Sequence, residues 1–263
     1  MSQMIKVAIV NYLNTTPFIY GLKHGPLNEK IQLIECIPAE CASLYQSGMV
    51  DLSLVPVGAM NQDLDHRISD FGIASDGPVA SVCILSEVPL DKITSVYLDY
   101  QSRTSILLAR LLFNKFWKLN PVFLNAEAGY ETDIKGNKAG VVIGDRALAL
   151  KSRYAYVFDL GQAWKEYTAL PFVYAVWLQT TILSSEFIEL FNQSLAFGVN
   201  SISAILKDHT PTQQEMLSKY FSENIRYLLT PDYDQGLDRF LSESRIYTKQ
   251  MNAEPERANK ESV

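Results

Sequence analysis

The stretch Tyr154–Thr180, YAYVFDLGQAWKEYTALPFVYAVWLQT, decides the fold class of this 263-residue chain. It joins an aromatic-rich acidic turn, a Thr-Ala-Leu-Pro break and an uninterrupted apolar strand, Phe172–Leu178. Because that strand carries no charge, we expect it to be buried on both faces, as in parallel α/β sheets. Thr168 and Pro171 punctuate the chain just before the strand enters the interior. The stretch therefore predicts one wall of a ligand cleft, with a polar group at its entry.

The composition of the chain narrows the class of partner. The chain is 48% hydrophobic and has a net charge of −6 and a pI near 5.2. The apolar content is enough for a substantial core, and no long basic stretch is present to attract nucleic acid or an anionic membrane surface. We therefore expect a small-molecule partner, no nucleic acid and no membrane.

The N-terminal residues and the cysteines predict a reduced, cytoplasmic protein. The first residues, MSQMIKVAIVNYL, pass into a strand without a targeting signal. No apolar stretch reaches the roughly 18 residues that a membrane-spanning helix needs. Cys36, Cys41 and Cys83 lack metal-ligand spacing and are interpreted as reduced thiols, so we expect no metal and no cofactor.

Short apolar strands alternate with helical patterns along the chain, which indicates an α/β protein with βαβ crossovers. Strands are expected at 6–12, 31–37, 49–56, 79–86, 96–99, 139–143 and 172–178, and the chain after residue 178 is expected to be almost wholly helical. If two of these strands, 79–86 and 172–178, cross between two lobes, residues 1–84 and 178–250 form lobe 1. Residues 85–177 then form lobe 2, and the charged residues 251–263 a flexible tail.

Polar loops at the ends of these strands should converge on the cleft between the lobes. Asn14, in the NYLNTTP stretch, fits either a helix N-cap or a ligand contact, and both stay open. Asp145 is by default an N-cap, the alternative being that it orients a neighbouring donor or contacts a substrate hydroxyl. The histidines are isolated, and no Ser-His-Asp order or nucleotide-binding fingerprint is present.

The segment Ser102–Ser105 ends a strand and opens a helix, where free amides and hydroxyls can hold a carboxylate or a phosphate. The same residues could instead only cap the helix, and Arg103 could be a solvated surface charge. We favour anion binding, because the three hydroxyls of Ser102, Thr104 and Ser105 exceed what one cap needs.

Six motifs occur in collinear order over roughly residues 5–180: NYLNTTP, DGPVASV, SRTSILLARLL, VVIGDRAL, FDLGQAW and TALPFVYAVW. In this order they resemble the chorismate dehydratases of the futalosine pathway of menaquinone biosynthesis. The resemblance implies an α/β, two-lobed, type 2 periplasmic-binding-protein-like fold with a ligand cleft between the lobes. It also implies a hydro-lyase that converts chorismate to 3-[(1-carboxyvinyl)oxy]benzoate and water. The sister enzyme that cleaves cyclic dehypoxanthine futalosine shares the fold, but its expected Cys-Pro-Asn-Asp stretch is absent here.

By this resemblance, Asn14 and Ser81 match two functionally important polar side chains of the family, and we expect both to be catalytic. The expected substrate-binding residues are Ser102, Arg103, Thr104, Ser105, Asp145 and Thr168. Thr168 would close the second wall of the cleft. The chain departs from the family at Ala169, where glycine is frequent, so this backbone position must accept a methyl group.

Two other classes compete with the enzyme. A non-catalytic solute-binding protein for a small carboxylate would use the same cleft to capture and release its ligand, although the usual export signal is absent. A catalytically silent sensor lobe is a third class, but no output domain accompanies it. The sequence leaves the oligomeric state open, a homodimer being one outcome, and we expect the lobes to close over a bound ligand.

Overall fold

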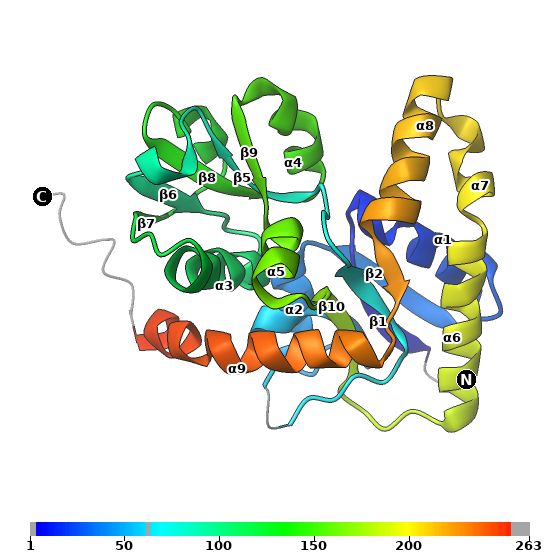
Figure 1. Cartoon of the computed structure of the whole chain (residues 1–263). Coiled ribbons are helices and arrows are strands. Elements are labelled where there is room, and N and C mark those ends of the chain that lie inside the picture. The colour runs from blue at the N-terminus through cyan, green and yellow to red at the C-terminus, as the bar shows by residue number, and fades with distance from the viewer. Residues whose placement is uncertain (1–3, 62–63, 254–263) are drawn as a thin grey trace, which may run out of the picture.

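The structure of the protein, a computed structural model, describes residues 4–61 and 64–253. Its strands form two separate sheets, one of six strands and one of five, with helices packed around both (Figure 1). In spatial order the larger sheet contains β11 (Arg226–Leu228), β4 (Phe71–Ser75), β10 (Phe172–Gln179), β3 (Leu52–Pro56), β1 (Ile5–Val10) and β2 (Ile31–Cys36). The smaller sheet contains β7 (Val122–Asn125), β6 (Ser95–Leu98), β8 (Lys138–Ile143), β5 (Val82–Ser86) and β9 (Tyr156–Asp159).

Both sheets are mixed rather than parallel. In the larger sheet β1 pairs in parallel with β2 and β3, whereas β10 is antiparallel to both β3 and β4. In the smaller sheet β6 is parallel to β7 and β8, and β5 is antiparallel to β8 and β9. The expectation of a parallel setting for Phe172–Leu178 is therefore wrong, although its burial is confirmed. An all-apolar run reports burial on both faces, and it does not report the direction of its neighbours.

The helices divide between the two sheets. Those in the lobe of the larger sheet are α1 (Thr16–His24), α2 (Pro38–Gln46), α6 (Ser185–Asn200), α7 (Ile202–Ile205), α8 (Pro211–Lys219) and α9 (Pro231–Ala253). Those of the smaller sheet are α3 (Arg103–Leu111), α4 (Gly144–Leu150) and α5 (Leu160–Thr168). Helix α9 runs from the larger sheet to α3 beneath the smaller one (Figure 1), where Tyr247 Oη donates to Asn114 Oδ1 at 3.0 Å.

The chain passes twice between the sheets, immediately before β5 and immediately before β10. Strand β5 pairs with β8 and β9 of the smaller sheet, and β10 pairs with β3 and β4 of the larger one. Boundaries at 84/85 and 177/178 would cut through these two strands. We propose instead that the lobes meet in residues 76–81 and 169–171, so that lobe 2 comprises about residues 80–170.

Four strands have no counterpart in the sequence prediction: β4, β7, β9 and β11. Strand β11 lies inside the block that was expected to be helical, so that expectation is wrong there. It has three residues and pairs at the sheet edge with β4, and so short a run has no periodicity to distinguish it from a helical turn. Of the expected tail, residues 251–253 belong to α9, and residues 254–263 lie outside the described part.

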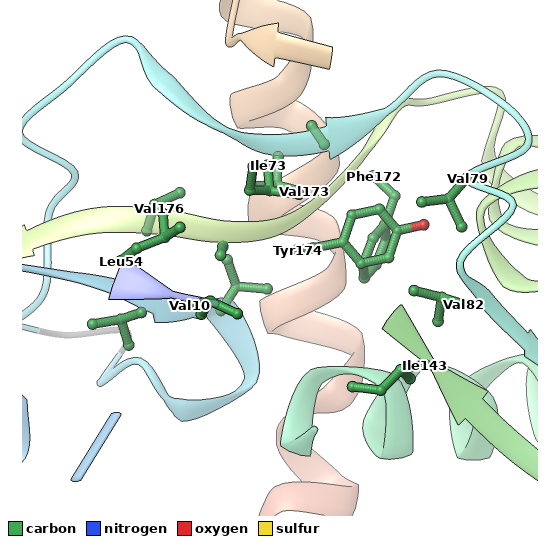
Figure 2. Close-up of a cluster of buried hydrophobic side chains, with 14 of the residues drawn as sticks. Val10, Leu54, Ile73, Val79, Val82, Ile143, Phe172, Val173, Tyr174 and Val176 are labelled. Carbon is green, nitrogen blue, oxygen red and sulfur yellow. The ribbon is translucent and has the colours of Figure 1, made fainter. Parts of the chain in front are cut away.

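The core is continuous across the junction of the lobes and contains several large aromatic residues. Trp164, Phe172 and Trp177 are almost fully buried, as expected for core residues. Tyr174 is different, because it points from β10 toward Val79 and Val82 at the crossing between the lobes (Figure 2). Among the helices in the described residues, none combines the length and apolar composition that crossing a membrane requires.

Candidate active site

A cavity of about 550 Å³, including the part open to solvent, lies at the junction of the two lobes. Its apolar wall includes Val10, Ile73, Val79, Ile143 and Tyr174, several of which appear together in Figure 2. Its polar wall includes Tyr12, Asn14, Thr15, Ser81, Ser102, Thr104 and Ser105. None of the described lining residues carries a charge.

Starts of helices surround the uncharged cavity. Residues at or near the start of α1, α2, α3 and α4 line it, namely Thr15, Pro38, Ser102 and Gly144. The first amides of a helix lack intrahelical partners and carry partial positive charge, so they favour anions. The cavity can therefore attract carboxylates through hydroxyls and amides without a cationic side chain in its wall.

Asn14 lies in the 3₁₀ turn η1 (Leu13–Thr15), between β1 and α1. Its Oδ1 atom is buried and has no hydrogen-bond partner among the described residues. The neighbouring Thr15 hydroxyl is already engaged, because it donates to the Tyr12 carbonyl at 2.7 Å. An unsatisfied buried polar atom costs about 1–3 kcal/mol, and a ligand donor in the cavity would remove that cost. This geometry supports the ligand-contact interpretation of Asn14 rather than the capping one.

Ser81 stands at the start of β5, where the chain enters lobe 2, and only 1% of the residue is exposed. Its Oγ accepts a hydrogen bond from Tyr220 Oη at 2.8 Å. The Val79 carbonyl lies 3.5 Å from the same oxygen, which is at the limit of a hydrogen bond. The Ser81 carbonyl accepts from Gly144 N at 2.7 Å, which fixes the backbone of the residue against the start of α4.

Asp159 holds the backbone that leads to Ser81. Its carboxylate accepts from the amides of Val79 and Ala80 at 3.1 and 2.7 Å, and from Gly161 and Gln162 at 2.9 and 3.0 Å. It is thus the N-cap of α5 and also the anchor of the crossing, where Ala80 has a left-handed φ of +65°. Burial raises the pKa of this carboxyl, and the four amide donors act in the opposite direction. The sequence indicated only a turn at Asp159.

The start of α3 combines capping with hydroxyls that face the cavity. Ser102 Oγ accepts from Ser105 N at 3.2 Å and donates to Ser105 Oγ at 2.9 Å. Because Ser105 Oγ receives this proton, its own hydroxyl proton is free for an acceptor in the cavity. Thr104 Oγ1 accepts from Gly58 N of lobe 1 at 3.0 Å. Arg103 does not line this cavity; it lines an adjacent hollow with Tyr100 and Gln101.

Asp145 and Thr168 lie outside the lining of the cavity. Asp145 Oδ1 accepts from Leu13 N at 3.0 Å, so it orients the turn that carries Asn14 and connects the two lobes. Thr168 ends α5, where its hydroxyl donates to the Trp164 carbonyl at 2.7 Å and accepts from Leu170 N at 3.1 Å. The structure therefore brings Asn14, Ser81 and the α3 hydroxyls together in the cavity lining, and it leaves Asp145 and Thr168 outside that lining.

A buried polar network supports the loop before α3. Arg146 NH2 lies 2.6 Å from Asp99 Oδ2 and donates to Gln101 Oε1 at 3.0 Å, and Asp99 also accepts from Tyr130 at 2.9 Å. Tyr12 of lobe 1 donates to the same Gln101 oxygen. Arg146 is thus committed to the carboxylates of Asp99 and Glu131. Burial raises the pKa of Tyr12, so its phenol stays protonated and acts as a donor.

Three tyrosines of the site were not identified from the sequence: Tyr12, Tyr174 and Tyr220. Tyr12 belongs to the same NYLN motif as Asn14, and this proximity in sequence could have identified it as a site residue. Tyr174 belongs to the run Phe172–Leu178, which was expected to be a buried strand, and it also lines the cavity. Tyr220 comes from the C-terminal helical block, 139 residues from Ser81, and no local pattern announces the contact. The described residues contain no group of three or more His, Cys, Asp or Glu side chains that could hold a metal, and the three cysteines are free.

Comparison with known proteins gives a family and a fold. A protein family described as menaquinone biosynthesis matches residues 5–245 of the chain. A chorismate dehydratase of Thermus thermophilus is 31% identical over 190 residues, which cover 65% of this chain and 68% of that protein.

Solved structures resemble the chain over almost its whole length. A protein of Archaeoglobus fulgidus superposes with a TM-score of 0.69 at 16% identity, covering 94% of this chain and 98% of that one. The aliphatic sulphonate binding protein of Escherichia coli, which is periplasmic, gives a TM-score of 0.59 at 14% identity, covering 95% and 94%. A Candida albicans protein with the generic periplasmic binding protein fold gives 0.58 at 14% identity, covering 97% and 92%. The expected fold class is thereby confirmed.

Proposed function

The chain belongs to the menaquinone biosynthesis family, and we propose that within it the protein is a chorismate dehydratase that forms 3-[(1-carboxyvinyl)oxy]benzoate and water. In reaction class it is then a hydro-lyase, and as a biosynthetic enzyme we assign it to the cytoplasm. The observation that carries the proposal is the uncharged interlobe cavity, in which the unpartnered Asn14 Oδ1 lies among helix starts and hydroxyls. These features match a substrate with two carboxylates and one hydroxyl.

The chemistry of the reaction explains how an uncharged cavity lined by hydrogen-bond donors can promote the elimination of water. Loss of the ring proton beside the enol ether leaves an electron pair conjugated through a double bond with the ring carboxylate. The pair forms the last double bond of the benzene ring as the neighbouring hydroxyl departs, and the lost proton and hydroxyl together make one water. Donors that hold the ring carboxylate stabilise the negative charge as it develops. The elimination of water requires no external oxidant or reductant.

We assign the ring carboxylate to the start of α3. Ser105 Oγ can donate there, because Ser102 supplies the hydrogen bond that Ser105 accepts. The amides of the first helical turn add partial positive charge. Asn14 then faces the departing hydroxyl, whose proton fits the unpartnered Oδ1, and Ser81 donates to the substrate from the opposite lobe.

The cavity offers no side chain that would serve as a base at neutral pH. Its described lining contains no histidine, carboxylate or lysine, and the phenols of Tyr12 and Tyr174 have pKa values raised by burial. A carboxylate of the substrate itself, that of the enolpyruvyl group, is the remaining candidate for taking the ring proton. Closure of the lobes would keep water away from the charged intermediate.

The alternative function is a non-catalytic solute-binding protein for a small carboxylate, since the fold is shared with such proteins. The two functions separate in one experiment: purified protein is incubated with chorismate, and the mixture is analysed by chromatography and mass spectrometry. A product lighter by one water that accumulates beyond the amount of protein supports the dehydratase. Calorimetric binding of chorismate with no product supports the binding protein instead.

Substitutions in the cavity connect the activity to this site. We expect Asn14→Ala and Ser81→Ala to lower kcat/KM by about 100-fold or more, because each removes a hydrogen bond to the reacting substrate. Ser86→Ala is the matched control, because this buried serine lies at the other end of β5 and its hydroxyl donates to Val88 O at 2.8 Å. A loss of melting temperature without a selective loss of turnover would assign Asn14 and Ser81 structural roles.

A further inference from the structure

We propose that Tyr220 is a positioning residue for the reaction, which acts by holding the Ser81 hydroxyl with its proton directed into the cavity. The inference rests on the proposed dehydratase function and adds to it a residue from the C-terminal helical block. Tyr220 is not among the described residues that line the cavity, and its hydroxyl meets that lining at Ser81. It is 3% exposed and contacts Phe221 among the aromatic residues around it.

The direction of the hydrogen bond follows from the chemistry of the two hydroxyls. Burial raises the pKa of Tyr220 far above neutrality, so the phenol keeps its proton. Its Oη lies 2.8 Å from Ser81 Oγ and donates to it. A serine oxygen that accepts from the phenol must place its own proton elsewhere. The Val79 carbonyl, at 3.5 Å, is a poor acceptor, whereas the cavity that Ser81 lines offers the substrate oxygens.

Without the Tyr220 phenol, the Ser81 hydroxyl no longer has a reason to direct its proton into the cavity. The Ser81 side chain could then rotate and compete for weaker acceptors of its own backbone, such as Val79 O. A serine whose rotamer is already set loses less freedom when the transition state forms, so its contribution to rate is larger. The expected effect of Tyr220 is therefore on turnover more than on substrate binding.

The backbone around Tyr220 is arranged to deliver this contact. Tyr220 begins a π-helical turn, η8 (Tyr220–Asn224), between α8 and β11, and such turns are frequent at functional sites. Four residues later Asn224 Nδ2 donates to the Pro78 carbonyl at 2.9 Å. One wide turn of lobe 1 thus contacts the crossing segment at two points, Pro78 and Ser81. The lobe that carries Asn14 thereby also sets the orientation of the catalytic serine of the other lobe.

A double-mutant cycle tests the proposal. Tyr220→Phe removes only the phenolic oxygen, and we expect kcat for chorismate to fall by about tenfold while KM changes by less than about threefold. In the Ser81→Ala background, the same substitution should change kcat by less than about twofold, because its target is gone. An equal loss in both backgrounds, or a wild-type kcat for Tyr220→Phe, would overturn the proposal.

Tyr227→Phe is the matched control. Tyr227 belongs to the same block, in β11, is 5% exposed, and its hydroxyl has no hydrogen-bond partner among the described residues. Removing that hydroxyl should leave kcat and KM unchanged. A loss of kcat for Tyr227→Phe equal to that of Tyr220→Phe would attribute the effect to general packing of the block and contradict a specific role.

A structural readout separates this inference from the proposed function. Crystal structures of the wild type and Tyr220→Phe, both without substrate, report the Ser81 rotamer directly. A shifted or doubled Ser81 Oγ position in the variant supports positioning by Tyr220, and an unchanged single position overturns it. This holds even if the wild type does not convert chorismate, a result that would refute the dehydratase function alone.

Discussion

Gly58, in the 3₁₀ turn η2 (Val57–Ala59) after β3, lies directly against the start of α3 in the other lobe. A Cβ atom at Gly58 would lie 2.7 Å from both N and Cα of Thr104 and 3.0 Å from the carbonyl carbon of Arg103. The Gly58 amide also donates to Thr104 Oγ1. Because the obstructing atoms are all backbone, no rotation of a side chain can accommodate the added methyl group of Gly58→Ala.

The size of the effect follows from these distances. An ordinary van der Waals contact of about 3.4 Å requires a movement of about 0.7 Å. Inserting a methyl group into a close-packed contact costs about 1–3 kcal/mol. Since the two surfaces belong to different lobes, we expect the lobes to separate rather than the fold to break. If the whole cost falls on the closed, reactive state, kcat/KM for chorismate drops about 5- to 150-fold.

Steady-state kinetics and urea unfolding measure the two consequences separately. Gly48→Ala is the matched control, because Gly48 has a φ of +66° and its Cβ would meet no described atom within 4 Å. This control should lose about 1–2 kcal/mol of unfolding free energy and keep its kcat/KM. Gly58→Ala should show the reverse pattern. A kcat/KM within twofold of the wild type for Gly58→Ala would refute the role of this contact in closure.

Three further predictions concern Thr168 and Ala169 at the end of α5 and Asp159 at its start. Thr168→Val should cost about 1–2 kcal/mol of unfolding free energy, through its lost bonds to Trp164 and Leu170, with kcat/KM within about twofold of the wild type; a selective loss of kcat/KM would instead place Thr168 at the substrate. Ala169→Gly should stabilise the protein by up to about 1 kcal/mol in thermal unfolding, because φ is +62° there and glycine relieves more strain than its extra unfolded-state freedom costs; a lower melting temperature would contradict this. Burial raises the folded-state pKa of Asp159 above its ordinary 3.8, so the folded protein holds this proton more tightly. The free energy of unfolding of the wild type, measured relative to that of Asp159→Asn by denaturant unfolding, should therefore fall as the pH rises from about 4 through the folded-state pKa. A difference that grows over this pH range would contradict the prediction.

The parts of the fold that the sequence predicted are those with strong local signals. The charge-free run Phe172–Leu178 and the helix that opens at Ser102–Ser105 were recognised, because burial and helix initiation leave a mark on adjacent residues. The edge strands β7, β9 and β11 are short and partly exposed, and their pairing partners are distant in sequence. Their formation depends on tertiary contacts that no local window contains.

The candidate site likewise contains residues that a local sequence signal revealed and residues that it did not. Asn14, Ser81 and the hydroxyls of α3 line the cavity, and they were found through motifs and through the chemistry of a helix start. Tyr220 and the amide donors to Asp159 were not found, because each contact joins segments far apart in the chain. Thr168 was expected at the substrate because it is a polar residue before a buried strand. Its hydroxyl instead donates to the Trp164 carbonyl at the end of its own helix. The homodimer remains a prediction that these contacts do not address.

The most direct test of the dehydratase function is proton NMR of chorismate in the presence of a catalytic amount of the purified protein. If the cavity performs the dehydration, the signals of the ring proton beside the enol ether and of the proton on the carbon that bears the hydroxyl disappear as aromatic signals grow. The enolpyruvyl methylene signals should persist, and the aromatic product should exceed the protein by many turnovers. Chorismate signals that broaden on binding but are not replaced by aromatic ones would contradict the claim that this cavity performs the dehydration.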